Sequence, residues 1–199
     1  MKLKPQIGGE GGEIVQVEPG TYEAVLEEVR GYRGKKYKSE EYEPKLVFIW
    51  NLGEDEDGNP IHLWDFVRLP RDREGYPVLN ENSHLYARLA ALYGEPFPHD
   101  DPKFAPEIVF PEEYDSPEGL DALPTFEEAK EEGFKPVVVR SLKVAGEELL
   151  GREALVTVVM KETKNGPRSV VQNVSPKPKA KRPKVRRLEA EAEAAGAPL

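Results

Sequence analysis

The segment from Arg30 to Lys38 carries residue types that bind nucleic acid. It places five cations and two aromatic residues within nine positions. Cations attract a phosphate backbone and aromatic rings offer faces on which bases stack, which is the combination that single-strand-binding proteins use. The candidate binding residues of this segment are Tyr32, Arg33, Lys35, Lys36, Tyr37 and Lys38. Because three glutamates follow at positions 40, 41 and 43, a merely solvated hairpin loop remains the alternative.

A second group of aromatic and basic residues lies between positions 45 and 69. Residues 45–52 and 61–69 are dense in β-branched and aromatic side chains, and the acidic stretch between them ends in Gly58, Asn59 and Pro60. This pattern predicts a β-hairpin. Its first arm adds Lys45 and Trp50 to the candidate binding residues, although Trp50 also suits a core position.

Alternation along the second arm assigns its two faces. The aliphatic face, which suits a core, consists of Ile61, Leu63, Val67 and Leu69. The opposite face carries Trp64, Phe66 and Arg68, and we expect these to point outward and bind bases and phosphates. Asp65 shares the parity of the aliphatic set, which indicates a bulge or a barrel end there, or the opposite assignment of the two faces.

The elements that must support this hairpin can be located on either side of it. Residues 21–29 suit a first strand, although Glu27 and Glu28 leave a helix possible. Gly31 and Gly34 allow a sharp bend or a bulge that would let the strand serve two sheet edges. Further on, Ser83 can cap a helix whose leucines recur at helical spacing until Gly94 ends it.

The last predicted unit is another hairpin. Residues 153–160 and 168–175 read as strands around Asn165 and Gly166, a dipeptide that tight turns favour. This turn adds three cations to the candidate binding residues, namely Lys161, Lys164 and Arg168.

Charge is divided unevenly along the chain. Residues 94–132 hold 13 acidic residues and two lysines, whereas residues 177–187 hold seven basic residues and no acidic one. The Pro-rich acidic stretch suggests a solvated insertion, and the basic stretch suggests a disordered arm. The net charge of −9 therefore reflects the insertion more than the remaining core.

Five strands with a helix between the third and the fourth predict a mainly β fold, an OB-like five-stranded barrel. In that fold the second and third strands and the 1–2 and 4–5 loops bind oligonucleotides. We divide the chain into a flexible segment at 1–17, an OB-fold domain at 18–176 with its insertion at 95–142, and a disordered tail at 177–199.

Several stretches resemble the OB-fold single-stranded DNA-binding proteins of bacteriophage replication and recombination modules. The resemblance lies in residues 19–24, 45–50, 85–94, 150–158 and 170–174. It implies binding of single strands without catalysis. Members of this family often end in an acidic tail that recruits replication proteins, whereas here a basic arm is followed by only three glutamates.

Enzyme and metal sites find little support. The carboxylates between Asp100 and Asp115 lie among prolines and favour a solvated loop over a nuclease centre. His62, His84 and His99 lack the spacing of metal ligands, and there is no cysteine. We therefore expect no catalysis, no metal and no cofactor.

Composition also leads to expectations about membrane association, cellular location and source. No stretch reaches the roughly 20 apolar residues of a membrane span, and the N-terminus lacks the apolar run of a signal peptide. We expect a cytoplasmic protein without membrane partners, located in an infected bacterial host if it is phage-encoded. The absence of cysteine, the two methionines and the abundant charge also fit a thermophilic source.

The expected partner is single-stranded DNA, with replication or recombination proteins and a second copy of the chain as further candidates. An alternative function belongs to a different class. The acidic insertion would dock on a basic protein and make the chain an adaptor or inhibitor, or it would fold back over the basic face and compete with DNA.

Overall fold

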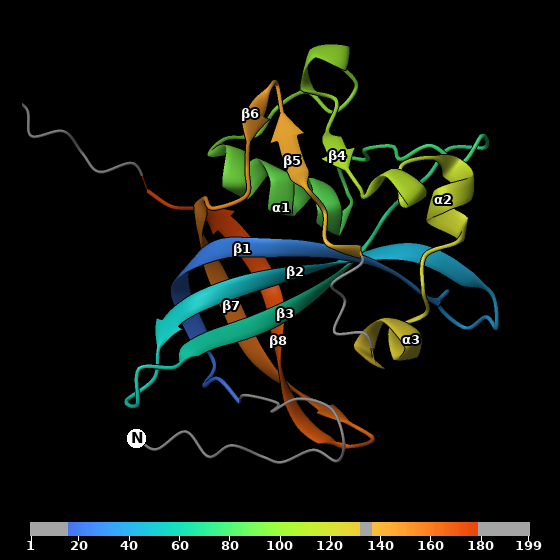
Figure 1. The fold of residues 1–199 in the computed structure, drawn as a ribbon. Coiled ribbons are helices and arrows are strands. Elements are labelled where there is room, and N and C mark those ends of the chain that lie inside the picture. Colours follow the sequence, from blue (N-terminus) through green and yellow to red (C-terminus); the bar gives the residue numbers. More distant parts are fainter. Residues whose placement is uncertain (1–15, 132–136, 179–199) are drawn as a thin grey trace, which may run out of the picture.

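The computed structural model describes residues 16–131 and 137–178, and its fold is mainly β (Figure 1). Within these ranges eight strands form two antiparallel sheets. The strands are β1 (Gly20–Lys35), β2 (Tyr42–Glu54), β3 (Pro60–Arg68), β4 (Glu107–Val109), β5 (Ser141–Val144), β6 (Glu147–Glu148), β7 (Glu153–Thr163) and β8 (Gly166–Pro176). The helices are α1 (His84–Tyr93), α2 (Pro117–Asp121) and α3 (Phe126–Glu131), with 3-10 turns η1 (Pro102–Phe104) and η2 (Glu112–Tyr114). The predicted flexible segment up to residue 15 and the tail from residue 179 lie outside the described ranges.

The larger sheet has the strand order β3-β2-β1-β7-β8. Both predicted hairpins are confirmed, as β2–β3 and β7–β8. The expected closure into a barrel is not confirmed, because β3 and β8 form the two edges and no backbone ladder joins them within the described residues.

Strand β1 serves two neighbours, as predicted, but its irregularity lies elsewhere. Residues 20–25 pair with β7 and residues 25–35 pair with β2, with a register shift between Leu26 and Glu28. The predicted bulge at Gly31 and Gly34 is therefore misplaced. Gly31 instead allows close packing, since a Cβ atom there would lie 2.7 Å from Cε1 of Phe110.

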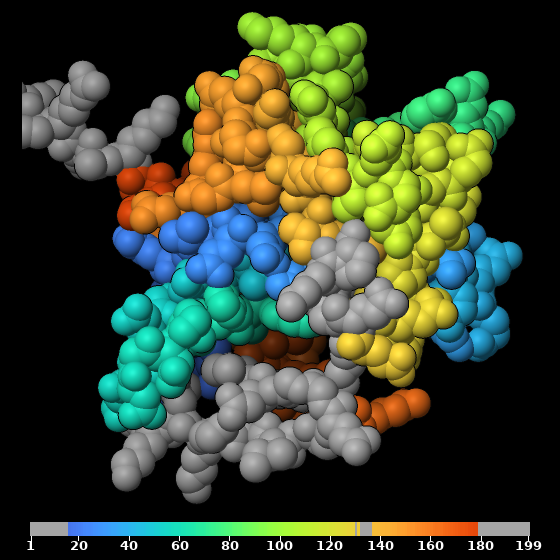
Figure 2. Space-filling view, in the orientation of Figure 1, coloured from blue at the N-terminus to red at the C-terminus, as the bar shows by residue number. Residues whose placement is uncertain are grey.

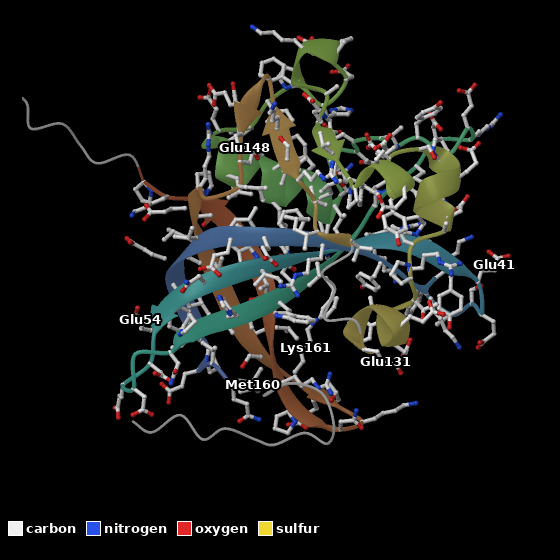
Figure 3. The ribbon with its side chains drawn as sticks, in the orientation of Figure 1. Glu41, Glu54, Glu131, Glu148, Met160 and Lys161 are labelled. Atoms are coloured by element: carbon white, nitrogen blue, oxygen red, sulfur yellow. The ribbon has the colours of Figure 1, made fainter. Side chains whose placement is uncertain are left out.

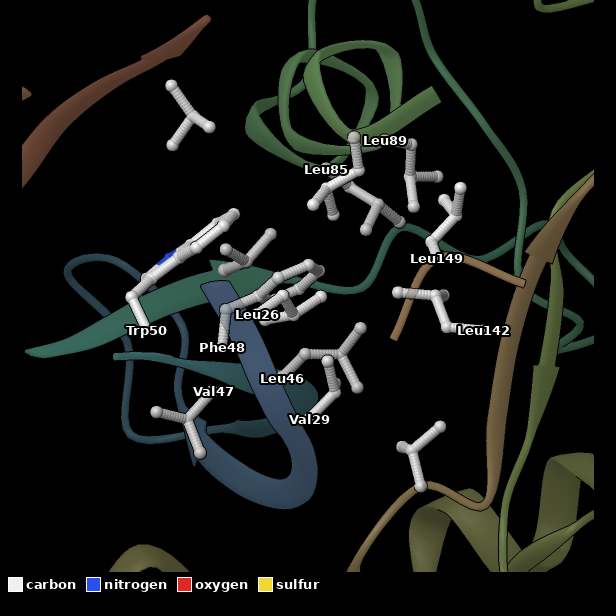
Figure 4. Close-up of a cluster of buried hydrophobic side chains, with 14 of the residues drawn as sticks. Leu26, Val29, Leu46, Val47, Phe48, Trp50, Leu85, Leu89, Leu142 and Leu149 are labelled. Atoms are coloured by element: carbon white, nitrogen blue, oxygen red, sulfur yellow. The ribbon is translucent and has the colours of Figure 1, made fainter. Parts of the chain in front are cut away.

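The core lies on the inner face of the larger sheet and is covered by α1. Ser83 accepts a hydrogen bond from the backbone N–H of Tyr86 at 3.1 Å, and Gly94, with a φ of 99°, ends the helix as predicted. Figure 4 shows Leu85 and Leu89 of α1 reaching toward the strand side chains of the core. In the same view Val47 points away from its neighbours on β2, because successive residues of a strand face opposite ways.

The acidic insertion is folded rather than merely solvated. Its β4 joins β5 and β6 in the smaller sheet. Buried apolar side chains, among them Phe97, Phe110, Leu123 and Ala129, connect it to the main core. The predicted loop character fails because these apolar residues are spaced irregularly, so that periodicity does not reveal their burial.

Candidate nucleic-acid interface

The candidate interface is the face of β1, β2 and β3 that does not carry Leu46, Phe48 and Trp50. Tyr32, Val47 and Ile49 on this face are themselves buried, so only part of it is open to solvent. Backbone register aligns residues of the three strands in rows across this face. We call it the outer face and define it by Arg30, Tyr32, Lys45, Val47, Ile49, Trp64, Phe66 and Arg68. The predicted parity of β3 is correct, because Leu63, Val67 and Leu69 are buried whereas Phe66 and Arg68 are exposed.

An aromatic cluster occupies the middle of the outer face. The side chain of Phe66 is 47% exposed, and its ring centroid lies 6.3 Å from that of Trp64. Tyr32 meets Phe66 edge-on at 6.0 Å. The Arg30 guanidinium lies 6.0 Å from the Trp64 ring centroid, at the limit of a cation–π contact. Phe66 is half exposed and Trp64 is partly exposed, so this cluster presents aromatic surface to solvent mainly through Phe66.

Phe126 of α3 completes the cluster from the insertion. Its ring centroid lies 5.7 Å from that of Phe66 and 5.6 Å from that of Tyr32. A hydrogen bond from the backbone N–H of Arg33 to the Pro124 carbonyl oxygen, at 2.8 Å, holds the start of this helix beside β1. The sequence gives no sign of this contact, because nothing in a six-residue acidic helix indicates which surface it covers.

Two of the predicted aromatic residues do not offer a stacking face. Trp50 is fully buried on the inner face, and its indole N–H donates to Oδ2 of Asp65 at 3.5 Å, so the prediction that it binds nucleic acid is wrong. Tyr32 is only 5% exposed. Burial, with a smaller effect of the Glu43 charge, raises the pKa of the Tyr32 hydroxyl, which therefore stays neutral and supports Phe66.

The cations of the outer face are held by carboxylates. Arg30 pairs with Glu28 at 2.5 Å, while Arg68 and Lys45 both face Glu43, at 3.0 and 3.8 Å. Glu43 is 8% exposed, and sequence reasoning misses its role because it reads as part of a solvated acidic run. These pairs orient the cations but also offset their charge.

The β1–β2 turn repeats this pairing nearer to solvent. Lys35 meets Glu40 at 2.5 Å and Lys36 meets Glu41 at 2.6 Å. The hydrogen bond and charge of Glu40 raise the pKa of Lys35. In turn Lys35 lowers the pKa of Glu40, and Lys36 lowers the pKa of Glu41. The predicted basic loop is thus present, but two of its lysines carry a local counter-charge.

The other binding residues predicted between Arg30 and Lys38 lie in different environments. Tyr37 is 87% exposed, and the Lys38 ammonium nitrogen lies 5.3 Å from its ring centroid. Lys38 adopts a φ of 54°, and both residues lie in the turn that the hydrogen bond from the Lys36 backbone N–H to the Glu41 carbonyl oxygen closes. Arg33 instead turns toward the insertion, where its Nε–H donates to the Leu123 carbonyl oxygen, so it does not join the outer face.

The β7–β8 turn carries the third basic group. Lys161 and Lys164 are exposed. Lys161 lies opposite Arg168 in the backbone register of the hairpin. In Figure 3, Lys161 and Met160 of β7 lie below strands β2 and β3. In Figure 1 the β1–β2 turn points to the right and the β7–β8 turn points downward, with α3 between them. The two basic turns therefore flank α3 in this view instead of meeting.

Other chemistry is sparse in the described part of the chain. Residues 16–131 and 137–178 contain no group of three or more His, Asp or Glu side chains that could hold a metal ion. No helix in those ranges is long and apolar enough to cross a membrane. Comparison with protein-family models, curated protein sequences and solved structures found no match for this chain.

Proposed function

We propose that the chain binds single-stranded DNA through its outer face, without sequence preference and without catalysis. The observation that carries the proposal is the half-exposed ring of Phe66, which lies beside Trp64 on the edge strand β3. Arg30 and Arg68 flank these rings. Aromatic faces next to cations bind bases and phosphates together, and stacking tolerates any base.

An OB-like fold is the framework that we propose for this interface. Five strands with α1 between the third and the fourth strand of the larger sheet support it. OB-folds are partly open barrels that bind oligonucleotides on their second and third strands, and Trp64 and Phe66 of the aromatic cluster lie on β3, the third strand. A role in bacteriophage replication or recombination rests on the sequence resemblance at residues 19–24, 45–50, 85–94, 150–158 and 170–174.

The paired cations predict how binding responds to salt. A phosphate that approaches Arg68 or Lys45 competes with Glu43, so the gain from each contact is smaller than for an unpaired cation. Counterion release still makes the observed affinity fall as salt rises. We therefore expect modest affinity that weakens steeply with added salt.

The proposal is tested with a Trp64→Ala/Phe66→Ala double variant of the full chain in a gel-shift titration with oligo-dT. We expect a large loss of affinity in a variant that remains folded by circular dichroism. Unchanged affinity would reject the outer face as the binding surface. A chain shortened to residues 1–176 serves as a control, because it separates binding by the outer face from binding by the basic tail.

The second candidate is an adaptor function, in which the acidic insertion docks on a basic protein. The exposed acidic surface of α3 favours it. Glu127, Glu128 and Glu131 are exposed on this helix while Phe126 packs on the aromatic cluster. If the insertion competes with DNA for the outer face, Phe126→Ala will bind oligo-dT more tightly than the wild type. If the Phe126 ring instead supports Phe66 in binding, the same variant will bind more weakly.

A further inference from the structure

A polar groove of about 430 Å³ opens where the outer face ends. One wall is the base of the β1–β2 hairpin, with Lys36 and Glu43, and another is the turn at 70–75 that follows β3. The third wall is α2. In Figure 2 the yellow atoms of α2 and α3 lie close to the blue atoms of the β1–β2 hairpin, so the insertion and the hairpin form one continuous surface.

Two arginines of the groove are held in place by carboxylates. Glu43 accepts hydrogen bonds from Arg68 Nε at 3.1 Å and pairs with its Nη2 at 3.0 Å. Asp121 of α2 holds Arg71 at 2.9 Å. A guanidinium has five N–H donors, and Glu43 engages only one edge of Arg68, whose side chain is 69% exposed. Both groups are therefore oriented while donors remain for a further acceptor.

Most carboxylates of the groove already have donors from the chain itself. Asp72 accepts the backbone N–H groups of Glu74 at 2.9 Å and Tyr76 at 3.0 Å. Glu43 and Asp121 are engaged by arginines, as described above. Arg73, in contrast, is exposed and takes part in none of the ion pairs among residues 16–131 and 137–178. The groove thus presents one unpaired cation and two oriented guanidinium groups.

Arg68 belongs both to the outer face and to the groove. A strand whose bases lie on Trp64 and Phe66 therefore meets the groove directly beyond the end of β3. Guanidinium groups suit this position because their planar donors match phosphate oxygens.

We infer that the groove binds the backbone phosphates of the same single strand, through Arg68, Arg71 and Arg73. This inference rests on the proposed function, because it extends the path of the bound strand. It adds Arg71 and Arg73, which are not among the binding residues predicted from the sequence. Asp121 and Glu118 on α2 and the exposed Glu74 beside Arg73 oppose phosphate binding, so they limit the affinity of the groove.

The test compares fluorescence-anisotropy titrations of the full chain with labelled oligo-dT of about 5 and about 15 nucleotides, lengths within the range of OB-fold sites. For Arg73→Ala we expect affinity for the longer strand to fall roughly threefold to tenfold. The salt dependence of that binding should lose about 0.7 of a log–log unit, as for one phosphate contact on a single strand. Affinity for the shorter strand should stay unchanged, and Asp121→Asn should bind the longer strand more tightly.

Lys103→Ala is the matched control, because it removes one positive charge from η1, outside the groove. If Arg73→Ala weakens binding of the longer strand no more than Lys103→Ala does, the groove is not part of the path. That result would leave the outer face intact as the binding surface. If the wild type binds neither strand, the proposed function itself fails.

Discussion

Arg88 of α1 holds the carboxylate of Asp65 inside the core. Its Nε donates to Oδ2 at 2.9 Å and its Nη2 donates to Oδ1 at 3.2 Å, and the two residues are 3% and 4% exposed. This pair explains how an acidic residue can share the inner face of β3 with aliphatic side chains. Because Asp65 points inward, its neighbours Trp64 and Phe66 must point outward.

Removing one member of this pair should strongly destabilise the fold. Asp65→Ala leaves the Arg88 guanidinium buried without a counter-charge, which typically costs about 3 to 5 kcal/mol. We expect a loss of that order in the free energy of unfolding, measured by chemical denaturation. The double variant Asp65→Leu/Arg88→Leu should recover most of it, because no charge then remains buried. A loss below about 1 kcal/mol in the single variant would show that the pair is not needed.

The aromatic character of Phe66 should matter more than its apolar surface. Phe66→Leu keeps an apolar side chain but removes the stacking face, which is worth about 1 to 3 kcal/mol per base. We expect roughly fivefold or greater loss of affinity for oligo-dT in an anisotropy titration. Phe66→Trp should bind at least as well as the wild type. Equal affinity of the leucine and tryptophan variants would exclude stacking at this position.

The glutamates of the β1–β2 turn should restrain DNA binding. Glu40→Gln/Glu41→Gln removes the counter-charges of Lys35 and Lys36, so both ammonium groups become available to phosphates. We expect tighter binding of oligo-dT at low salt and a steeper salt dependence than in the wild type. Glu107→Gln/Glu112→Gln is the control for net charge, since these exposed glutamates lie in the insertion. An equal gain in both double variants would indicate a general charge effect rather than release of the two lysines.

Glu148 should contribute to the acid sensitivity of the smaller sheet. Partial burial alone would raise the pKa of Glu148, but hydrogen bonds from the Ser141 hydroxyl and the Leu142 and Leu150 N–H groups lower it below its ordinary value of 4.5. A lowered pKa means that the ionised group stabilises the fold above about pH 4.5, and that this contribution disappears as the pH falls through the folded-state pKa.

We therefore expect Glu148→Gln to lower the Tm at pH 6 and the difference from the wild type to shrink as the pH falls from about 4.5 to about 3. Thermal unfolding followed by circular dichroism measures this difference. A difference that stays constant over that range would mean that ionisation of Glu148 does not stabilise the sheet.

Local patterns in the sequence predict much of the larger sheet. The two hairpins, the helix that Ser83 caps and the two faces of β3 each follow from periodicity over fewer than ten residues or from a turn dipeptide. The pairing of Lys35 with Glu40 is also local, because a turn brings oppositely charged residues together.

Contacts between distant segments are what local patterns do not reveal. Arg88 lies on a helix whose spacing identifies only its leucines, so the partner of Asp65 stays hidden. Phe126 likewise follows Pro124 in an acidic stretch, with no periodic signal for the surface that it covers. The burial of Trp50 could not be distinguished from exposure, because both faces of β2 are apolar.

Trp64 makes possible the most direct test of the proposed interface, because it lies on the outer face while Trp50 is buried in the core. The measurement is a titration of the full chain with unlabelled oligo-dT at low salt, followed by tryptophan fluorescence. We predict saturable quenching that weakens steeply with added salt and disappears in Trp64→Phe, whose remaining emission comes from Trp50. If oligo-dT leaves the emission unchanged and no salt-dependent gel shift accompanies it, the chain does not bind single strands through this face.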